Sequence, residues 1–263
     1  MKDLKLKLIV LVGFIQMVTM NGLANSLPIN GKTTGAISDE LQNLFTPQGS
    51  TFAIWGLIYL LLFVFTIRIL LLPIPDFAQK ACKLFVINSL LNSSWILAWH
   101  YEYLGLSLLI MLGLLASLIL INQELNIPLK RYEIGMLQLP FSVYFGWVTV
   151  ATIANVTAVL VGYEWNGFGI AESNWALVIL FVGILISLSQ LFYFRNNAYG
   201  AVIIWAYCGI YGKHISESGF NSQYPMVANT AIVGIALMGL GVLILFLRKN
   251  RYLLKRAKKR SLT

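Results

Sequence analysis

Hydrophobic residues occur in long runs along the chain, and short polar segments separate the runs. Each run is about 20 residues long, which is enough for a helix to cross a bilayer core roughly 30 Å thick. The segment 198–212 is the shortest, so its crossing needs independent support. The pattern predicts eight helices, over residues 6–27, 50–72, 82–101, 104–122, 134–161, 173–194, 198–212 and 226–248.

The composition agrees with this pattern and excludes a soluble domain. Of the 263 residues, 58% are hydrophobic and 11% are charged, whereas soluble domains carry about 45–50% apolar and 25% charged residues. We therefore expect an all-α, polytopic membrane helix bundle. The net charge of +9 does not indicate a nucleic-acid partner, because the basic residues lie between and after the hydrophobic runs.

The basic residues predict the orientation of the bundle. With both termini in the cytoplasm, 17 of the 19 Lys and Arg residues lie in cytoplasmic segments or at the adjoining span ends, and only Lys32 and Lys213 lie outside. Such a bias is typical of cytoplasmic loops, and here it requires all eight crossings. We expect a multi-pass protein of the cell membrane, with residues 249–263 as a basic cytoplasmic tail held at anionic inner-leaflet lipid.

The N-terminal segment also has the features of a signal peptide, since a basic start and an apolar stretch are followed by small residues, with a candidate cut after Ala24. Cleavage would leave seven spans and an external N-terminus. Gln16, Asn21 and Asn25 favour retention, because a disposable hydrophobic segment has little use for polar side chains.

The cysteines and histidines offer little chemistry. Cys82 and Cys208 cannot form a disulfide framework, and we expect both to be small buried residues. A zinc site is the alternative use of the two histidines and the acids near them, but no zinc-ligand spacing supports it, and we expect no metal. These four residues are His100, Glu102, His214 and Glu217.

Polar and aromatic side chains gather on one face of three predicted helices. Residues spaced by three, four, seven or eleven positions share a helical face, and each of the three helices carries such a stripe. The members are Phe52, Trp55 and Tyr59 in the second helix, Asn88, Asn92, Trp95 and Trp99 in the third, and Tyr144, Trp147, Ala151 and Asn155 in the fifth.

These stripes share a layer of the membrane. At about 1.5 Å of rise per residue, Trp55, Trp95 and Asn155 each lie roughly 8–9 Å below the outer end of their helices. Ala151 leaves a gap near this layer, and the loop 28–49 lies above it. The stripes indicate either a covered pocket in the outer half of the bundle or ordinary interfacial aromatics with interhelical Asn contacts, and spacing alone does not separate the two.

Three segments together resemble the tryptophan-rich sensory protein family (TspO/MBR), relatives of the mitochondrial translocator protein or peripheral benzodiazepine receptor. The blocks occur in family order and at family-like spacing. TPQGSTFAIWGLIYLLL resembles the start of the family's second helix through Pro47, Phe52, Trp55, Ile58 and Tyr59, LLNSSW resembles LNxxW through Leu91, Asn92 and Trp95, and WVTVATIAN resembles WVxFAxxLN through Trp147, Val148, Ala151 and Asn155.

The chain also departs from the family pattern. Phe52 and Trp55 are three positions apart where many members have four, Pro140 lies seven residues before Trp147 where four is usual, and the first loop lacks a Trp-rich stretch. The resemblance covers about residues 1–160. It implies a five-helix core over residues 1–161, while 162–248 add about three transmembrane helices, which we expect to pack beside the core without lining its pocket.

The resemblance implies a pocket between the helices and beneath the first loop, because members of the family bind tetrapyrroles, and some bind sterols or drug-like molecules. We expect a sensor or carrier for a flat hydrophobic molecule such as a porphyrin, with a tetrapyrrole as candidate ligand and no required cofactor. The missing loop aromatics and the added helices make a changed ligand plausible. The positions implied around the pocket are Trp55, Tyr59, Asn92, Trp95, Trp147, Ala151 and Asn155.

Two other classes of function compete with this reading. A transporter or permease component for a hydrophobic solute is one, although span interiors without ionisable side chains disfavour ion or proton coupling. A protein with a structural role beside other membrane proteins is the other.

We do not expect an enzyme, since no nucleophile–base pair, carboxylate pair or set of metal ligands lies within one layer of the membrane. Breakdown of a bound porphyrin is suggested only for the family. The expected partners are the lipid bilayer, the small molecule and, as a candidate, a second copy of the chain in a homodimer.

Overall fold

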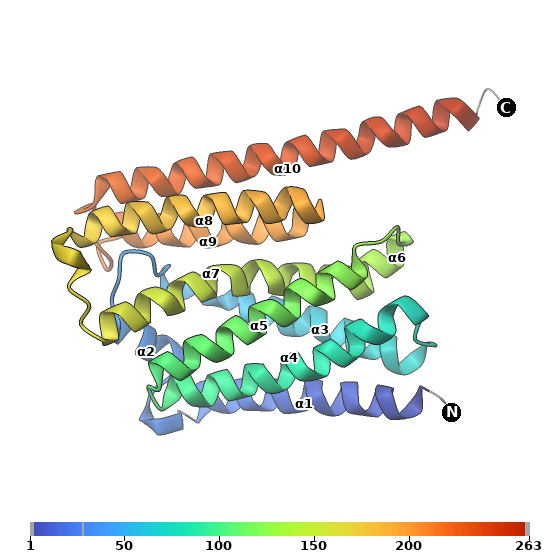
Figure 1. The fold of residues 1–263 in the computed structure, drawn as a ribbon, viewed down its shortest axis with the longest axis horizontal. Coiled ribbons are helices and arrows are strands. Elements are labelled where there is room, and N and C mark those ends of the chain that lie inside the picture. Colours follow the sequence, from blue (N-terminus) through green and yellow to red (C-terminus); the bar gives the residue numbers. More distant parts are fainter. Residues whose placement is uncertain (1–2, 28, 261–263) are drawn as a thin grey trace.

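The computed structural model describes residues 3–27 and 29–260, and for residues 249–260 it describes the backbone alone. All regular secondary structure in this part of the chain is helical (Figure 1). The long helices are α1 (Leu4–Ser26), α3 (Ile54–Leu71), α4 (Asp76–His100), α5 (Leu104–Leu125), α7 (Leu139–Gly162), α8 (Glu172–Phe194), α9 (Asn197–Ile215) and α10 (Pro225–Arg260).

Short helical elements connect the long ones. The loop predicted to cover the core contains α2, whose N-cap Thr33 accepts a hydrogen bond from the Ala36 backbone N–H through its side chain. A π-helical turn runs into α7 without a break, and Pro140 lies in the first turn of α7, directly after the π-helical turn. These elements are η1 (Ile29–Gly31), α2 (Thr34–Glu40), η2 (Gly49–Ala53), α6 (Arg131–Glu133), η3 (Ile134–Gln138) and η4 (Gly167–Gly169).

All eight predicted helices are present, with ends that differ by a few residues. The largest shift at a helix start is at α4, which begins at Asp76 instead of residue 82 because its polar first turns, after Pro75, lie outside the apolar run. Of the predicted basic tail, residues 261–263 lie outside the described chain, and the backbone of 249–260 continues α10 as a helix.

Seven helical segments in the described chain are long and apolar enough to cross a membrane, and α9 is not among them. Its 19 residues include tyrosines, glycines and Lys213, which lower its mean hydropathy. Many of these side chains are nevertheless buried where α9 packs against α7 and α10. At about 1.5 Å per residue α9 is roughly 28 Å long, so the eighth crossing stays a prediction that its length supports.

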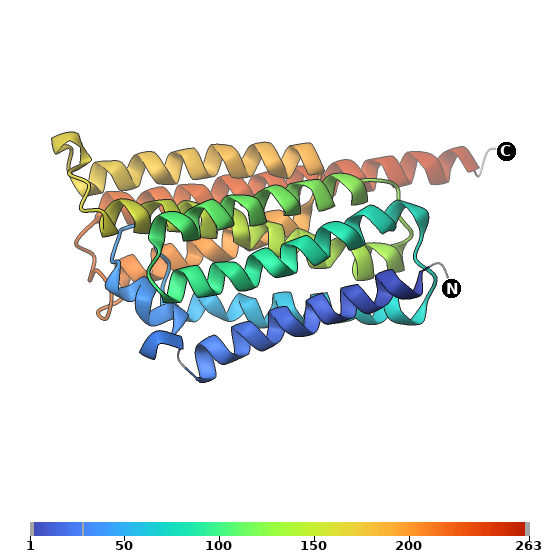
Figure 2. The ribbon, with the colours of Figure 1, turned by 60° about the horizontal axis from the view of Figure 1, so that its bottom comes forward.

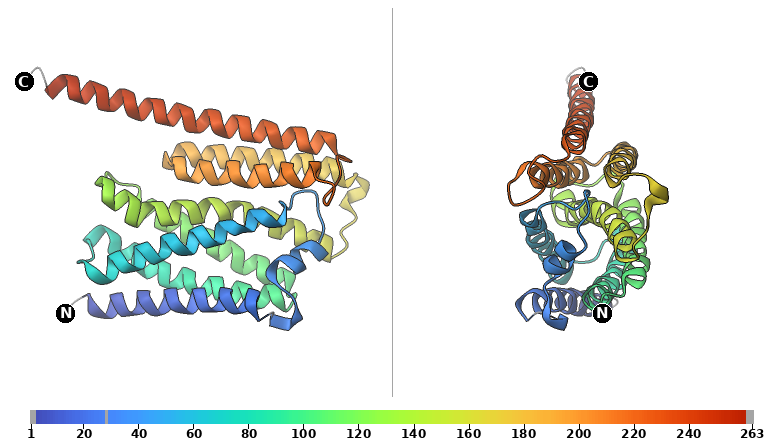
Figure 3. Two further views of the ribbon diagram at one scale, coloured as in Figure 1. Left: turned by 180° about the vertical axis from the view of Figure 1, so that it is seen from behind. Right: turned by 90° about the vertical axis from the view of Figure 1, so that its left-hand side faces the viewer.

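Five helices form a closed ring. α1 packs against α3 and α4, α4 packs against α5, α5 packs against α7, and α7 packs against α3. The added helices α8, α9 and α10 lie together beside this ring, and α9 makes their main contact with it, on α7 (Figure 3). The ring is made of the five long helices that lie within residues 4–162.

Both chain ends lie at the same end of the bundle (Figures 1 and 2). The loops between α3 and α4, between α5 and α6 and between α8 and α9 lie at that end too. The segment just before α2, which contains Lys32, and the last turn of α9, which contains Lys213, lie at the other end. The charge distribution predicts that the end with the termini faces the cytoplasm.

Cysteine labelling tests this orientation. In a variant with both native cysteines replaced by alanine, a cysteine at Glu164 should react with an impermeant maleimide added to intact cells. A cysteine at Pro128 should react only after lysis, because the α5–α6 loop lies at the opposite end. Labelling of the Pro128 position in intact cells would reverse the orientation.

Burial of the two cysteines differs from the expectation. Cys82 is buried as predicted, but the prediction was wrong for Cys208, which is exposed on α9. A thiol that faces lipid needs no cover from the bundle, because its surroundings are already apolar.

Tightly packed aromatic rings fill the ring of helices toward the end that holds the termini. Phe65, Phe85 and Phe141 are fully buried, with ring centroids 4.8–5.8 Å apart and nearly perpendicular planes. Such edge-to-face contacts are favourable between aromatic rings. This phenylalanine cluster closes the half of the ring nearest the chain termini.

Contact between α9 and α10 depends on Gly234. A Cβ at this position would lie 2.6 Å from Tyr207 Cδ1, and the buried Tyr207 ring is held by its hydroxyl, which donates to the Leu180 carbonyl at 3.0 Å. We expect Gly234→Ala to cost about 1–3 kcal/mol of stability. Gly239 in the same helix faces open space, so Gly239→Ala should be neutral or stabilising by up to about 1 kcal/mol. Equal thermal unfolding midpoints in detergent would contradict this packing.

Candidate ligand-binding site

Two adjoining cavities lie in the half of the five-helix ring opposite the chain termini. The first, the Trp147 cavity, has a volume of about 50 Å³ and is lined by Trp147, Ala151 and Asn155 among others. The second, the Tyr59 cavity, has a volume of about 360 Å³ and includes Tyr59. The residues common to both linings are Thr34, Phe52, Trp55 and Trp95.

Six of the seven positions that the resemblance implies line these cavities. Asn92 is the seventh and lies deeper in α4, fully buried and outside both linings. The three sequence stripes therefore face one another across the ring, as their shared layer predicts.

Aromatic rings form most of the surface between the two cavities. Trp55 stacks on Tyr59 with centroids 5.6 Å apart and meets Trp147 edge-on at 6.3 Å. Phe52 also meets Trp147 edge-on, at 5.5 Å, and Trp95 stacks on its neighbour in the stripe, Trp99, at 5.7 Å. The arrangement presents flat apolar faces in several orientations.

A chain of hydrogen bonds forms the floor below the cavities. Asn21 Nδ2 donates to Asn92 Oδ1 at 2.6 Å, and Asn92 Nδ2 donates to the Tyr144 hydroxyl at 2.9 Å. The chain joins α1, α4 and α7 across the ring. It places α1 among the core helices and explains why a polar Asn21 occurs in that apolar segment.

The second amide of the stripes is also bonded within the protein. Trp95 Nε1 donates to Asn155 Oδ1 at 3.0 Å, and Asn155 Nδ2 donates to Ser107 Oγ at 3.0 Å. Asn155 lines the Trp147 cavity, yet its polar groups connect α4, α5 and α7. Asn92 and Asn155 thus serve interhelical contacts, which is one of the two interpretations that the spacing left open.

Two other polar groups beside the cavities have no hydrogen-bond partner among the described residues. They are the indole Nε1 of Trp147 and the hydroxyl of Tyr59, and both atoms are buried. Trp147 is only 2% exposed. A buried donor without a partner is costly, so each group is available to a ligand that supplies an acceptor.

The roof of the Trp147 cavity comes from α2 and the segment that follows it. Trp99 Nε1 donates to the Thr34 carbonyl at 3.2 Å, and His100 Nε2 lies 2.9 Å from Thr34 Oγ1. Asn43 Oδ1 accepts from the Phe45 and Thr46 backbone N–H groups, forming a tight turn over the cavity. The sequence predicted a covering loop but not these residues.

A pair of carboxylates holds one edge of the roof. Lys32 Nζ lies 2.6 Å from Glu40 Oε2 and 2.8 Å from Glu102 Oε1. Hydrogen bonds to Glu102 and then Glu40 raise the pKa of the Lys32 ammonium above its ordinary value. The ion pairs join α2 to the turn between α4 and α5 at the exposed surface, where such pairs are worth little energy individually.

The added helices hold the roof without lining the cavities. None of the residues around the two cavities in the described chain comes from 162–248. From α9, however, the Gly209 carbonyl accepts from the Gln48 N–H at 3.1 Å, and Trp205 Nε1 donates to the Thr51 carbonyl at 3.0 Å. His214 Nε2 lies 2.9 Å from the Leu44 carbonyl.

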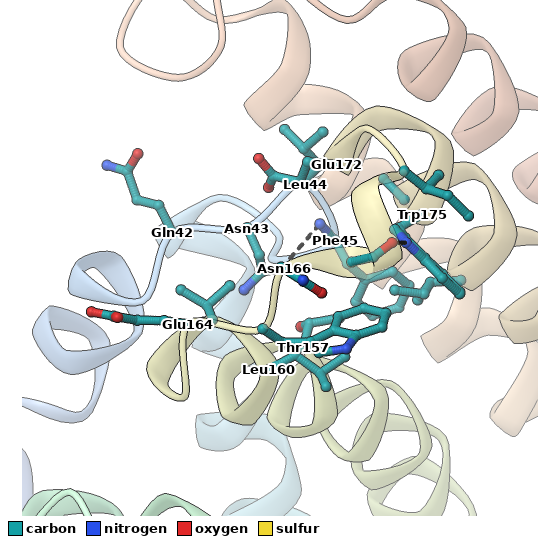
Figure 4. Close-up of a pocket in the computed structure, with 16 residues that line it drawn as sticks. Gln42, Asn43, Leu44, Phe45, Thr157, Leu160, Glu164, Asn166, Glu172 and Trp175 are labelled. Atoms are coloured by element: carbon teal, nitrogen blue, oxygen red, sulfur yellow. Dashed lines mark hydrogen bonds between the residues drawn. The ribbon is translucent and has the colours of Figure 1, made fainter.

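A larger, more open cavity of about 470 Å³ lies on the other side of the same roof segment (Figure 4). Glu172 and Trp175 of α8, Asn166 and the roof residue Phe45 lie around it. Asn43 lines both this cavity and the Trp147 cavity. No sequence pattern indicated this cavity, because its walls combine loop residues with the end of α7 and the start of α8.

Both histidines are hydrogen-bonded within the protein. His100 is bonded to Thr34 and to the Ile29 carbonyl, and His214 is bonded to the roof. Within residues 3–27 and 29–260, no three His, Cys, Asp or Glu side chains are grouped so that they could hold a metal ion.

Comparison with known proteins identifies one family. The family model described as TSPO-like protein matches residues 7–244. The match extends beyond the five-helix ring and takes in α8, α9 and most of α10. No curated protein and no solved structure matches the chain.

Proposed function

Because the chain belongs to the TSPO-like protein family, we propose that it binds a flat, hydrophobic molecule such as a porphyrin in the Trp147 and Tyr59 cavities. The observation that carries the proposal is the pair of buried groups without partners, Trp147 Nε1 and Tyr59 OH, beside aromatic walls. Aromatic surface supplies stacking and apolar contact, and a few polar groups fix orientation, which is the usual composition of small-molecule sites.

The size of the cavities indicates how the ligand is held. Ligand sites usually measure about 300–1,000 Å³. The volume of the Tyr59 cavity falls in this range, whereas the Trp147 cavity has very little free volume. The ring of the ligand occupies the Tyr59 cavity against Trp55 and Tyr59. Movement of the shared residues Phe52 and Trp55 then admits one edge of the ligand toward Trp147.

Two features favour binding over passage or catalysis. The phenylalanine cluster and the Asn21–Asn92–Tyr144 chain close the ring below the cavities. In the described linings, the ionisable side chains are those of Asp39 and Tyr59. A closed floor suits a ligand that enters and leaves from the outer side, and so few ionisable groups offer little acid–base chemistry.

Titration with protoporphyrin in detergent tests the proposal, with binding followed by the absorbance of the porphyrin. Tyr59→Phe and Trp147→Phe each remove a group that has no partner among the described residues. We expect affinity to fall about three- to tenfold for each, since a hydrogen bond contributes about 0.5–1.5 kcal/mol. The thermal midpoint of Tyr59→Phe should stay close to that of the native chain, whereas that of Trp147→Phe should fall, because a smaller ring leaves a gap at a buried position.

Matched variants separate binding from stability. Trp95→Phe breaks the bond to Asn155, so it should lower the thermal midpoint as well as affinity. Tyr193→Phe alters an exposed tyrosine on α8 and should change neither. If Tyr59→Phe and Trp147→Phe bind protoporphyrin as tightly as the native chain, the two groups do not contact the ligand and the proposed site is wrong.

A further inference from the structure

A separate cavity of about 770 Å³ lies at the end of the bundle that holds both termini, between α7, α8, α9 and α10. Arg195 and Arg248 line it, and within the described lining no Asp or Glu accompanies them. In the part of the chain with described side chains, neither arginine takes part in an ion pair. We propose that this cavity binds the phosphate headgroup of an anionic phospholipid.

The polar side of the cavity suits a phosphate. α9 begins at Asn197, and the first N–H groups of a helix lack intrahelical partners and carry partial positive charge. Together with the two guanidinium groups, which bind phosphate oxygens in a bidentate manner, they make this end of the cavity strongly favourable for an anion.

The two asparagine side chains at the start of α9 differ in their hydrogen bonding. Both polar atoms of the Asn196 amide have partners within the protein, since its Oδ1 accepts from the Tyr199 N–H at 3.2 Å and its Nδ2 donates to Ser142 Oγ at 2.5 Å. Asn197 Oδ1 is buried and has no partner among the described residues. It is placed to accept from a hydroxyl, which a glycerol headgroup carries next to its phosphate.

The apolar side of the cavity indicates a lipid as the source of the phosphate. Leu139, Phe192 and Leu245 line it, and Phe192 is 39% exposed on the outer face of α8, where lipid chains would lie. Basic pockets between transmembrane helices on the cytoplasmic side are suited to anionic headgroups, and the charge distribution predicts that this end faces the cytoplasm. The site is far from the aromatic cavities, so it stands independently of the function proposed for them.

Lipid titration of the full-length protein in detergent tests the inference. Phosphatidylglycerol carrying a fluorescent acyl chain should bind more tightly than the matching phosphatidylcholine. Arg195→Gln and Arg248→Gln should each lower the phosphatidylglycerol affinity about fivefold, because a basic residue near anionic lipid is worth about 1 kcal/mol. They should lower the phosphatidylcholine affinity less, because that headgroup carries no net charge.

Lys83→Gln is the matched control, because it removes one exposed positive charge at the same end of the bundle, outside the cavity. An equal loss of affinity in Lys83→Gln would show general attraction to the basic face and overturn the site. Stabilisation of the native chain by soluble glycerol phosphate to the same extent as by phosphatidylglycerol would mean that the ligand is a free phosphate, and the assignment to a lipid would be wrong.

Discussion

Replacing Ala151 with phenylalanine is expected to lower the affinity for protoporphyrin at least tenfold. Ala151 lines the Trp147 cavity, where the free volume is only about 50 Å³. A phenyl ring there fills the space toward which the edge of the ligand must move. A tenfold loss of affinity corresponds to about 1.4 kcal/mol of binding free energy. Losing all the contacts that the ligand makes in one well-packed region would cost more than this.

Stability must be measured alongside affinity, because overpacking alone costs about 1–3 kcal/mol. Val156→Phe is a suitable control, since Val156 lies on the same helix but is 37% exposed on the outer surface of the bundle. It should bind protoporphyrin as the native chain does. Unchanged affinity in Ala151→Phe, at a preserved thermal midpoint, would show that the stripes are ordinary helix packing.

Asn92→Leu is expected to destabilise the protein by about 1–3 kcal/mol. It removes the interhelical acceptor of the Asn21 amide, which keeps its bond to the Met17 carbonyl, and the donor to the Tyr144 hydroxyl; the Asn21 and Tyr144 side chains are both buried. Leaving buried polar groups unpaired costs about 1–3 kcal/mol each in soluble proteins, and interhelical hydrogen bonds in membranes average about 0.6 kcal/mol. The apparent midpoint of thermal unfolding should fall by several degrees.

The neighbouring Asn88 offers a matched comparison one turn away on α4. Asn88 is equally buried, but its Oδ1 has no partner in the described chain, and Ser117, which accepts from its Nδ2, still donates to the Leu114 carbonyl. Asn88→Leu should therefore cost less than Asn92→Leu. A larger loss for Asn88→Leu would contradict the role of Asn92 as the polar link between α1, α4 and α7.

Helical periodicity was enough to predict which side chains share a face and a depth. Trp55, Trp95 and Asn155 were therefore predicted to share a layer from spacing and length, and Trp147 was placed beside them by the resemblance. Periodicity does not fix how far each helix rotates about its axis or which polar atoms pair. The sequence thus could not show that the Asn92 amide is hydrogen-bonded to Asn21 and Tyr144, nor that Trp147 Nε1 has no partner among the described residues.

Segments held by distant contacts were the hardest to predict. The roof depends on bonds between residues 44–51 and α9, more than 150 positions later in the chain. α9 itself has lower hydropathy than its neighbours, because burial between α7 and α10 shields its polar residues from lipid. The exposure of Cys208 has the same origin, since the direction in which each face of α9 points depends on that packing.

Photo-crosslinking with a diazirine-bearing porphyrin, mapped by peptide mass spectrometry, tests the central claim most directly. Binding in the Trp147 and Tyr59 cavities predicts labels within residues 52–59, 95–99 and 147–155, which competing protoporphyrin suppresses. Labels confined to residues 160–179, around the more open cavity beside α8, or spread over lipid-facing side chains, would contradict it.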